Sequence, residues 1–150
     1  QSHGNNMQKL TIMVGPSGSG KSTKAKAMSL AFGSLICSAD DYFYDMFGNY
    51  NFDVNKLGVA HQQCYDKAKN GLSQGMSVII DNTNLRMKDI RTYLDLGVEF
   101  GVSGDIVVID TDWCDDVDKL MLTNTKGTPR EVIERQVQMF KNIRKQLNGS

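Results

Sequence analysis

The sequence predicts an α/β fold in which a parallel sheet of four to five strands lies between two layers of helices. From Met7 onward, short apolar runs alternate with longer segments of helical periodicity. The runs are apolar at nearly every position, which is typical of strands buried on both faces. Ligands of such sheets bind at the carboxyl ends of the strands, so functional residues are expected along that edge.

The first three elements are predicted by apolar content and by the glycines beside them. Residues 10–14 (LTIMV), which Gly15 follows, predict a buried strand. Residues 21–32 predict a helix that Gly33 ends, because glycine readily adopts the left-handed conformation of a C-terminal cap. Residues 34–38 (SLICS) predict a second strand. The residues expected to pack along this helix are Ala25, Met28, Leu30 and Phe32.

The middle of the chain predicts a turn, a loop and one long helix. Residues 40–47 are expected to form a short helical turn and residues 48–52 a loop. Asp53 has a side chain suited to the N-cap of a helix of about 20 residues, which would end near Gly71 or Gly75. The residues expected on the buried face of this helix are Val54, Leu57, Ala60, Cys64 and Ala68.

Two further strands and three helices complete the predicted order. Residues 76–80 (MSVII) and 105–110 (DIVVID) predict the third and fourth strands. Residues 88–100 and 114–122 predict helices, and the last helix is expected at 129–147. The last helix carries apolar residues at steps of three and four, namely Val132, Ile133, Val137, Phe140, Ile143 and Leu147. Its start resembles a capping box made by Thr128 and Glu131, with Pro129 at the first helical position.

Composition limits the classes of function. The 150 residues carry 17 Lys and Arg against 17 Asp and Glu, so the formal net charge is zero. This balance argues against non-specific coating of nucleic acid but leaves room for a local basic groove. Neither a transmembrane helix nor a signal peptide is predicted, so we expect no membrane partner and a cytoplasmic protein, or one in the host cytoplasm if phage-encoded. Residues 1–6 are expected to be a tag remnant and residues 7–150 a single domain.

Several single residues are expected to have ordinary structural roles. Cys37, Cys64 and Cys114 are odd in number and widely spaced, which favours buried free thiols over disulfides or a zinc site. We expect Trp113 in the core and His61 on a helix without a ligand role. The basic residues of 126–145 are read as a polar helix face, with nucleic-acid contact as the alternative.

The segment GPSGSGKS at residues 15–22 fits the phosphate-binding pattern G-x-x-x-x-G-K-[ST] at every position. Such a turn between a strand and a helix points successive backbone N–H groups at phosphate oxygens. Lys21 is expected to reach the β- and γ-phosphates, and Ser22 to ligate Mg²⁺. The motif predicts binding of ATP or GTP with Mg²⁺. The residues expected to contact the nucleotide are Gly15, Ser17, Gly18, Ser19, Gly20, Lys21, Ser22 and Thr23.

Polar residues follow the second and third predicted strands, at the same edge as the phosphate loop. Asp40 is a candidate general base for an acceptor hydroxyl, and the alternative is that Asp40 or Asp41 caps the next turn. Asp81 resembles a Walker-B acid that holds the metal, and the alternative is a plain D-N-T-N turn. Asn84 is a candidate for orienting the acceptor.

In this order and spacing, GPSGSGKST, SADDY, VIIDNTN and TPREVIERQ resemble the 5′-hydroxyl polynucleotide kinase family, particularly its phage members. The resemblance spans roughly residues 9–143 and implies an adenylate-kinase-like P-loop domain in which ATP phosphorylates the 5′-hydroxyl of DNA or RNA. By position, Lys21 and Ser22 match the family's phosphate-loop residues and Asp40 its general base. Asp81 and Asn84 lie in its D-x-T-N element.

The chain also departs from that family. Phe43 stands where the phage relatives have a substrate-contacting arginine, and it is retained as a candidate substrate contact. The family's lid arginines are missing, since no arginine precedes Arg130 in this region. Lys126 is therefore the expected lid cation and Arg130 the second candidate, although lysine offers phosphate only a point charge. The aromatic cluster, Tyr42, Phe43, Tyr44, Phe47, Tyr50 and Phe52, would stack on an acceptor base or pack beneath a loop.

These expectations lead to one principal function and two alternatives. The principal one is a Mg²⁺-ATP-dependent kinase that phosphorylates the 5′-hydroxyl end of DNA or RNA, with Asp40 as general base. The first alternative is the same chemistry on another alcohol, such as a nucleoside, a hydroxymethylated base in DNA or a small metabolite. The second is a nucleotide-binding regulatory module with little transfer activity.

Overall fold

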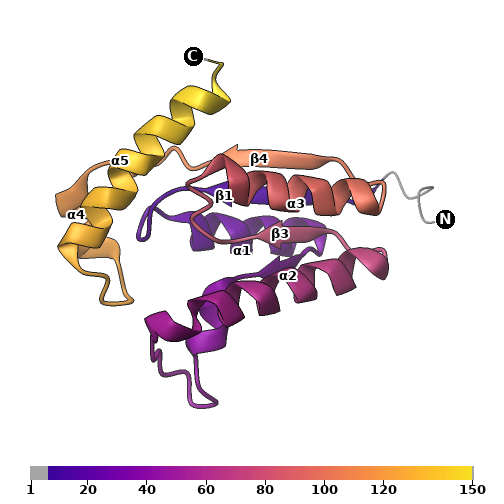
Figure 1. Ribbon diagram of the computed structural model, residues 1–150, viewed down its shortest axis with the longest axis horizontal. Coiled ribbons are helices and arrows are strands. Elements are labelled where there is room, and N and C mark those ends of the chain that lie inside the picture. Colours follow the sequence, from indigo (N-terminus) through magenta and orange to yellow (C-terminus); the bar gives the residue numbers. More distant parts are fainter. Residues whose placement is uncertain (1–6, 150) are drawn as a thin grey trace.

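A computed structural model describes residues 7–149, and within them the chain forms four strands and five α-helices (Figure 1). The predicted tag remnant, residues 1–6, lies outside the described residues. The elements in chain order are β1 (Leu10–Val14), α1 (Lys21–Phe32), β2 (Leu35–Cys37), η2 (Ala39–Phe43), η3 (Val54–Lys56), α2 (Leu57–Ser73), β3 (Val78–Ile80), α3 (Met87–Glu99), β4 (Gly104–Val108), α4 (Val117–Thr123) and α5 (Arg130–Leu147). The segments η2 and η3 are short 3₁₀ helices.

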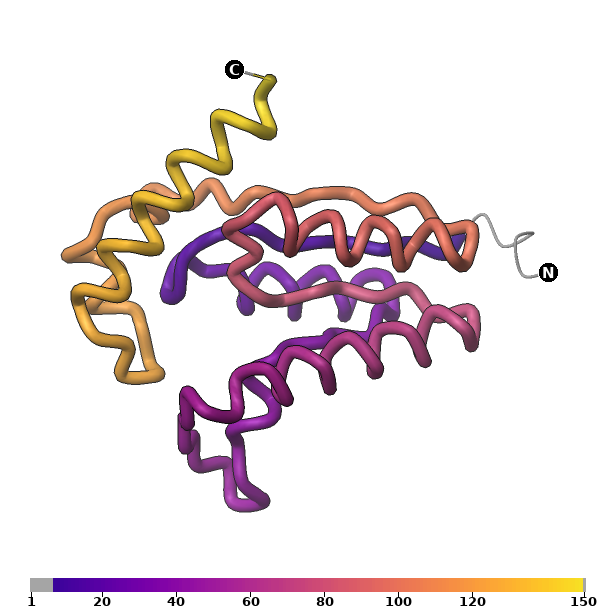
Figure 2. The backbone as a smooth tube through the Cα atoms, viewed as in Figure 1, coloured from indigo at the N-terminus to yellow at the C-terminus, as the bar shows by residue number. Residues whose placement is uncertain are grey.

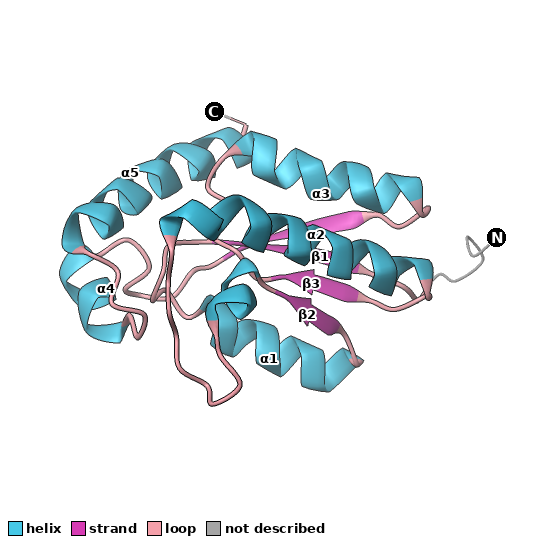
Figure 3. Cartoon of the chain, turned by 60° about the horizontal axis from the view of Figure 1, so that its bottom comes forward, coloured by secondary structure: helices cyan, strands magenta, loops and turns pink. Residues whose placement is uncertain are grey.

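The four strands form one sheet in the order β2-β3-β1-β4, and every neighbouring pair is parallel. Figure 3 shows α1 on one side of this sheet and α2 with α3 on the other. The tube in Figure 2 shows that α4 and α5 lie beyond the carboxyl ends of the strands, opposite the end at which β1 begins. The predicted α/β fold is therefore confirmed, and its strand ends face the last two helices.

The strands divide their side chains between two hydrophobic layers. Met13 of β1 and Ile79 of β3 face α1 and pack with Ala25. The alternate residues of β1 and β3, such as Ile12, belong to the larger core beneath α2 and α3. Phe140 of α5 is fully buried in that larger core. Because α5 is anchored there, its N-terminal half is held over the carboxyl edge of the sheet.

Some predicted packing faces were wrong. Leu30 and Phe32 of α1 are 88% and 71% exposed. Leu30 follows Ala25 by five residues, which turns it about 140° away from the face on the sheet, and Phe32 lies in the last turn before Gly33. Val54 is also mostly exposed, because Asp53 caps the short η3 and the α-helix begins only afterwards. The N-cap of α5 is Pro129, with no side-chain hydrogen bond, so the predicted capping box is absent.

The cysteine prediction is confirmed, since Cys37, Cys64 and Cys114 are all free and buried. Burial raises the pKa of the Cys37 thiol to about 12. Across residues 7–149, no helix combines the length and apolar character needed to cross a membrane.

Truncating Phe140 is expected to be far more costly than truncating Phe32. Phe140→Ala removes a fully buried ring and should lower the free energy of unfolding by about 3 to 5 kcal/mol. Phe32→Ala, the matched control, removes a ring that already lies in solvent and should change it by less than about 0.5 kcal/mol. Urea denaturation of both variants checks the pair. Equal losses would contradict the placement of α1 or of α5.

Candidate active site

The phosphate loop between β1 and α1 is held by side chains that bind its carbonyl oxygens. Gly18 and Gly20 have φ values of 84° and 96°, a left-handed conformation that glycine adopts readily. Trp113 Nε1 and Thr123 Oγ1 both donate hydrogen bonds to the Gly18 carbonyl, at 2.9 and 2.7 Å. The N–H groups of Gly15, Ser17 and Ser19 donate to other protein groups, so an anion would be bound by the remaining N–H groups of the loop. Trp113 is half-buried and packs against the small hydrophobic cluster between α4 and α5, so its expected place in the core is confirmed in part, and its indole also holds this loop.

Lys21 opens α1 and is buried beneath the loop, where its Nζ donates to the Pro16 carbonyl at 3.2 Å. Burial lowers the pKa of Lys21 to about 8, and the Asp81 carboxylate partly opposes this shift. A lowered lysine pKa means that, between about pH 8 and 10.5, the unfolded chain binds more protons than the folded one. Through this group, stability of the unliganded protein therefore rises with pH in that window.

Nucleotide binding is expected to return a proton to Lys21. At about pH 9 most Lys21 side chains in the free protein are neutral, and the phosphates of a bound nucleotide favour the charged form. Calorimetric titration with ADP, in buffers of different ionisation enthalpy, should show uptake of about one proton per site at this pH. The exposed Lys24 is the matched control, and Lys24→Met should retain the uptake. Binding without proton uptake would contradict the assignment.

Ser22 and Asp81 form the second feature of the site. Ser22 Oγ donates to Asp81 Oδ2 at 2.8 Å, which joins the start of α1 to the end of β3. Among the described side-chain nitrogen and oxygen atoms that are shielded from solvent, Asp81 Oδ1 is the one without a hydrogen-bond partner. A buried carboxylate oxygen without a donor fits a bound cation, and Mg²⁺ is commonly held by one carboxylate, a hydroxyl, water and phosphates. The donor set therefore fits the expected metal. Residues 7–149 contain no cluster of three His, Cys, Asp or Glu side chains that would hold a metal without the nucleotide.

Asp40 lies at the start of η2, at the same edge of the sheet. Its Oδ2 accepts a hydrogen bond from Lys126 Nζ at 2.7 Å, and its Oδ1 accepts one from the Tyr50 hydroxyl at 3.1 Å. Burial lowers the pKa of Lys126, but the hydrogen bond and charge of Asp40 outweigh it and raise this pKa overall. The cap of η2 is Ser38, whose hydroxyl accepts from the Asp40 N–H. The alternative role of Asp40 or Asp41 as the cap was therefore wrong.

These residues surround one cavity of about 340 Å³ at the carboxyl edge of the sheet. It brings together most of the predicted site, namely Ser17, Gly18, Gly20, Lys21, Ser22, Thr23, Asp40, Asp81 and Lys126. Gly15 and the buried Ser19 lie in the loop itself, where Ser19 Oγ donates to the Pro16 carbonyl at 2.6 Å. The structure thus assembles the phosphate loop, both candidate carboxylates and the expected lid lysine.

Three predicted substrate contacts do not line this cavity, although one of them, Asn84, lines a larger cavity that adjoins it. Phe43 is 5% exposed and packs against Tyr50 and other rings of its cluster, so it belongs to the core. Asn84 is buried with φ +47°, and its Nδ2 donates to the Met13 carbonyl at 2.7 Å, which fixes the loop after β3. Arg130 is exposed and ion-paired with Asp118 at 2.6 Å, so it does not serve as the lid cation in this arrangement. In each case tertiary packing or a nearer partner occupies the side chain.

Sequence reasoning missed Gln136, which lies on α5. Its Oε1 accepts the Ser17 N–H at 2.9 Å, so α5 reaches a backbone donor of the phosphate loop. The signal was present, because Gln136 interrupts the apolar stripe between Ile133 and Phe140 with a polar side chain. Its partner was not apparent, because residues 17 and 136 are far apart in the chain.

Comparison with known proteins places this arrangement in a family. Residues 10–147 match the family model AAA_33, described as an AAA domain. The chain belongs to the AAA_33 family. Human NEDD4-binding protein 2 is 34% identical over 136 residues, which are 89% of this chain and 8% of that protein. The chain therefore spans less than a tenth of the length of this curated relative.

Solved structures share the fold of this AAA_33 domain. In the Pnkp1/Rnl/Hen1 RNA repair complex, one chain matches with a TM-score of 0.75 at 23% identity, over 95% of this chain and 48% of that chain. A putative kinase from Chloroflexus aurantiacus matches with a TM-score of 0.62 at 17% identity, over 97% and 98% of the two chains. A sugar kinase from Janibacter matches at 0.58 and 20%, over 89% and 78%. These matches show that the chain shares its fold with these kinases.

Proposed function

We propose that this domain is an ATP-dependent kinase that transfers the γ-phosphate to a 5′-hydroxyl end of DNA or RNA. The observation that carries the proposal is the position of the Asp40 carboxylate, which lines the same cavity as Lys21 and the phosphate loop. A kinase needs a proton acceptor next to the phosphate that it transfers, whereas a nucleotide switch does not. The proposal takes ATP as the donor, with GTP as the other purine triphosphate to test.

In the proposed reaction, the acceptor oxygen attacks the γ-phosphorus as the bond to the ADP oxygen breaks. The proton of the acceptor hydroxyl passes to Asp40, and the departing charge stays on ADP. Lys21 and the loop N–H groups bind the β- and γ-phosphate oxygens, which supplies positioning and electrostatic stabilisation. Lys126 lies 2.7 Å from Asp40 and supplies a positive charge on the acceptor side.

Ser22 and Asp81 are the residues that would hold Mg²⁺ in this scheme. When bound, the ion neutralises charge on the β- and γ-phosphates. The hydrogen bond from Ser22 Oγ to Asp81 Oδ2 keeps both oxygens together before any ligand arrives.

The choice of a 5′-hydroxyl acceptor is supported by the SADDY, DNTN and TPREVIERQ segments, whose order resembles that of the 5′-hydroxyl polynucleotide kinase family. The fold match to a chain of an RNA repair complex agrees with this choice.

A second candidate, transfer to another alcohol such as a nucleoside, a hydroxymethylated base in DNA or a small metabolite, is favoured by a specific observation. Lysine stands in place of a lid arginine, and Arg130 is paired away from the cavity. The third candidate is a regulatory nucleotide-binding module with little transfer activity. It is favoured by the ion pair between Lys126 and Asp40, which engages the carboxylate that would otherwise accept the proton.

The test offers the protein γ-labelled ATP with a panel of acceptors. The panel contains a 5′-hydroxyl DNA hexamer, the matching RNA hexamer, hydroxymethylated DNA, nucleosides and hexoses. We expect label on the 5′-hydroxyl oligonucleotides. Label only on nucleosides or hexoses would favour the second candidate. Nucleotide binding without label on any acceptor would favour the regulatory module.

A further inference from the structure

A second and larger cavity, of about 660 Å³, adjoins the phosphate cavity. The two share Asn82 and Thr83, which follow β3, and Asn82 Oδ1 accepts the Ala39 N–H beside Asp40 at 2.8 Å. On the opposite side, Gln136 lines the larger cavity and contacts Ser17 of the phosphate loop. A group bound in the larger cavity therefore has a direct route to the general base and the transferred phosphate.

The lining of this larger cavity suits an uncharged ring system with polar edges. It offers amide and hydroxyl groups from Gln62, Thr92 and Gln136, together with the flat or flexible surfaces of Tyr65 and Met139. Its oppositely charged lining residues, Arg86 and Asp89, are ion-paired with each other at 3.1 Å. A nucleoside has this combination of hydrogen-bonding edges and a stacking face.

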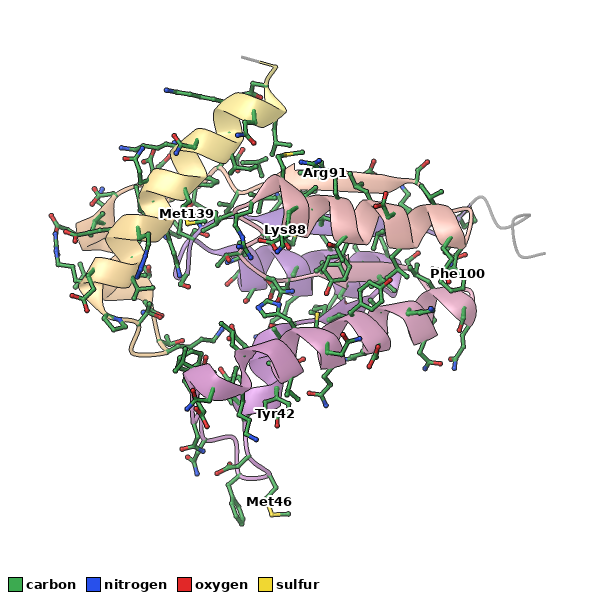
Figure 4. The ribbon with its side chains drawn as sticks, viewed as in Figure 1. Tyr42, Met46, Lys88, Arg91, Phe100 and Met139 are labelled. Carbon is green, nitrogen blue, oxygen red and sulfur yellow. The ribbon has the colours of Figure 1, made fainter. Side chains whose placement is uncertain are left out.

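A third cavity, of about 370 Å³, continues from the second between α3 and α5. It shares Leu85, Arg86 and Met139 with the larger cavity and extends to Arg91 and Gln146. Figure 4 shows Lys88 and Arg91 at the start of α3 on the side that faces Met139 of α5. The two cavities together form one groove, which leads away from the phosphate cavity.

Charge is unevenly divided between the walls of this groove. On the α3 wall, Arg91 lines the third cavity, is exposed and forms no salt bridge within residues 7–149. Lys88, on the same helix but outside the cavity lining, is also exposed and forms no salt bridge within these residues. On the α5 wall, the third cavity is lined by neutral amides and apolar side chains. Arg144 of α5 is ion-paired with Asp115 and lies over the Phe140 ring. Available positive charge therefore lies on the α3 wall of the groove.

We propose that this groove is the path of a single nucleic-acid strand. The 5′-terminal nucleoside occupies the larger cavity, and the phosphate that follows it lies against Arg91 in the third cavity. This inference rests on the proposed function and adds the residues that distinguish a polynucleotide from a free nucleoside. A small alcohol would occupy only the larger cavity, so a contact with Arg91 would add nothing to its affinity.

The inference is tested by equilibrium binding, which needs no turnover. The probe is a single-stranded dT hexamer with a free 5′-hydroxyl and a fluorophore at its 3′ end, followed by anisotropy. Arg91→Gln should weaken binding about threefold, and Arg91→Glu about tenfold. Between about 50 and 200 mM salt, Arg91→Gln should also reduce the slope of log affinity against log salt by about 0.7, the value for one lost phosphate contact. Lys26→Glu, on an exposed position of α1, is the charge-matched control and should leave the affinity within experimental error.

Steady-state transfer separates failure of the groove from failure of the proposed function. For wild-type protein, kcat/KM should be higher for the hexamer than for thymidine 3′-phosphate, and Arg91→Gln should lower that ratio. One outcome would overturn the groove and leave the kinase assignment standing. In it, the protein labels the hexamer, but Arg91→Glu changes neither the kcat/KM ratio of the two acceptors, nor the affinity, nor the salt slope. Binding that depends on Arg91 without transfer to any 5′-hydroxyl would support the groove and overturn the kinase assignment. Equal displacement of the hexamer by polyglutamate would overturn the groove as a nucleic-acid site.

Discussion

Asp40→Asn is expected to lower the rate of phosphoryl transfer about 10²- to 10⁴-fold, the usual contribution of a general base. The substitution keeps the size of the side chain and its ability to accept from Tyr50, but it removes the proton acceptor. Nucleotide affinity should change by less than about threefold, because the phosphate loop and Lys21 bind the phosphates without it. Single-turnover transfer and a nucleotide titration on the same preparation measure both quantities.

The adjacent Asp41 provides the matched control for Asp40. Its carboxylate is 59% exposed and lies 3.9 Å from Lys67, on α2. Asp41→Asn should therefore leave transfer within about twofold of wild type. Lys126→Gln is a useful comparison, since it breaks the same ion pair from the other side and leaves the carboxylate in place. Transfer by Asp40→Asn at the wild-type rate would show that another group accepts the proton.

Asp81→Asn is expected to remove the dependence of nucleotide binding on Mg²⁺ and to lower transfer about a thousandfold, since a catalytic metal supplies several kcal/mol. The variant replaces one buried carboxylate oxygen by an amide N–H₂ group, which repels a cation. The oxygen that lacks a hydrogen-bond partner, Oδ1, is the atom that the metal would engage. Titrations of ATP with Mg²⁺ and with EDTA should differ for wild type and coincide for the variant.

A control on β4 distinguishes local chemistry from general loss of negative charge. Asp105 is exposed on that strand, so Asp105→Asn should retain the full Mg²⁺ effect. An unchanged Mg²⁺ effect in Asp81→Asn would show that the ion binds elsewhere. Thermal unfolding of each variant without nucleotide confirms that the compared proteins are folded.

Most of the fold was predictable because its signals are local. The bounds of β1 and α1 follow from an apolar run, a glycine-rich turn and Gly33, all within the first quarter of the described chain. What could not be predicted depends on neighbours distant in sequence. Leu30 and Phe32 resembled a packing face, yet the sheet lies under the Ala25 side of α1. Phe43 resembled a substrate contact until its ring was seen to pack with Tyr50 and Phe52.

The site shows the same division. The phosphate-loop residues were found by motif, and Asp40 and Asp81 by their position after strands. Lys126 was named as the lid cation by elimination, and the structure brings its Nζ to Asp40. The supports of the loop were missed, because Trp113, Thr123 and Gln136 reach it from 95 to 119 residues away. Such contacts leave no local pattern in the sequence beyond a polar residue in an apolar stripe.

The most direct measurement compares two DNA hexamers that differ in one atom group. One carries a 5′-hydroxyl. The other is its 5′-deoxy analogue, in which the terminal sugar ring carries a methyl group in place of the hydroxymethyl group. With γ-labelled ATP and Mg²⁺, we expect label on the first hexamer, released as a 5′-mononucleotide by nuclease digestion, and none on the second. Equal labelling of both hexamers, or label on neither while nucleosides are labelled, would contradict a kinase that acts on the 5′ end of nucleic acid.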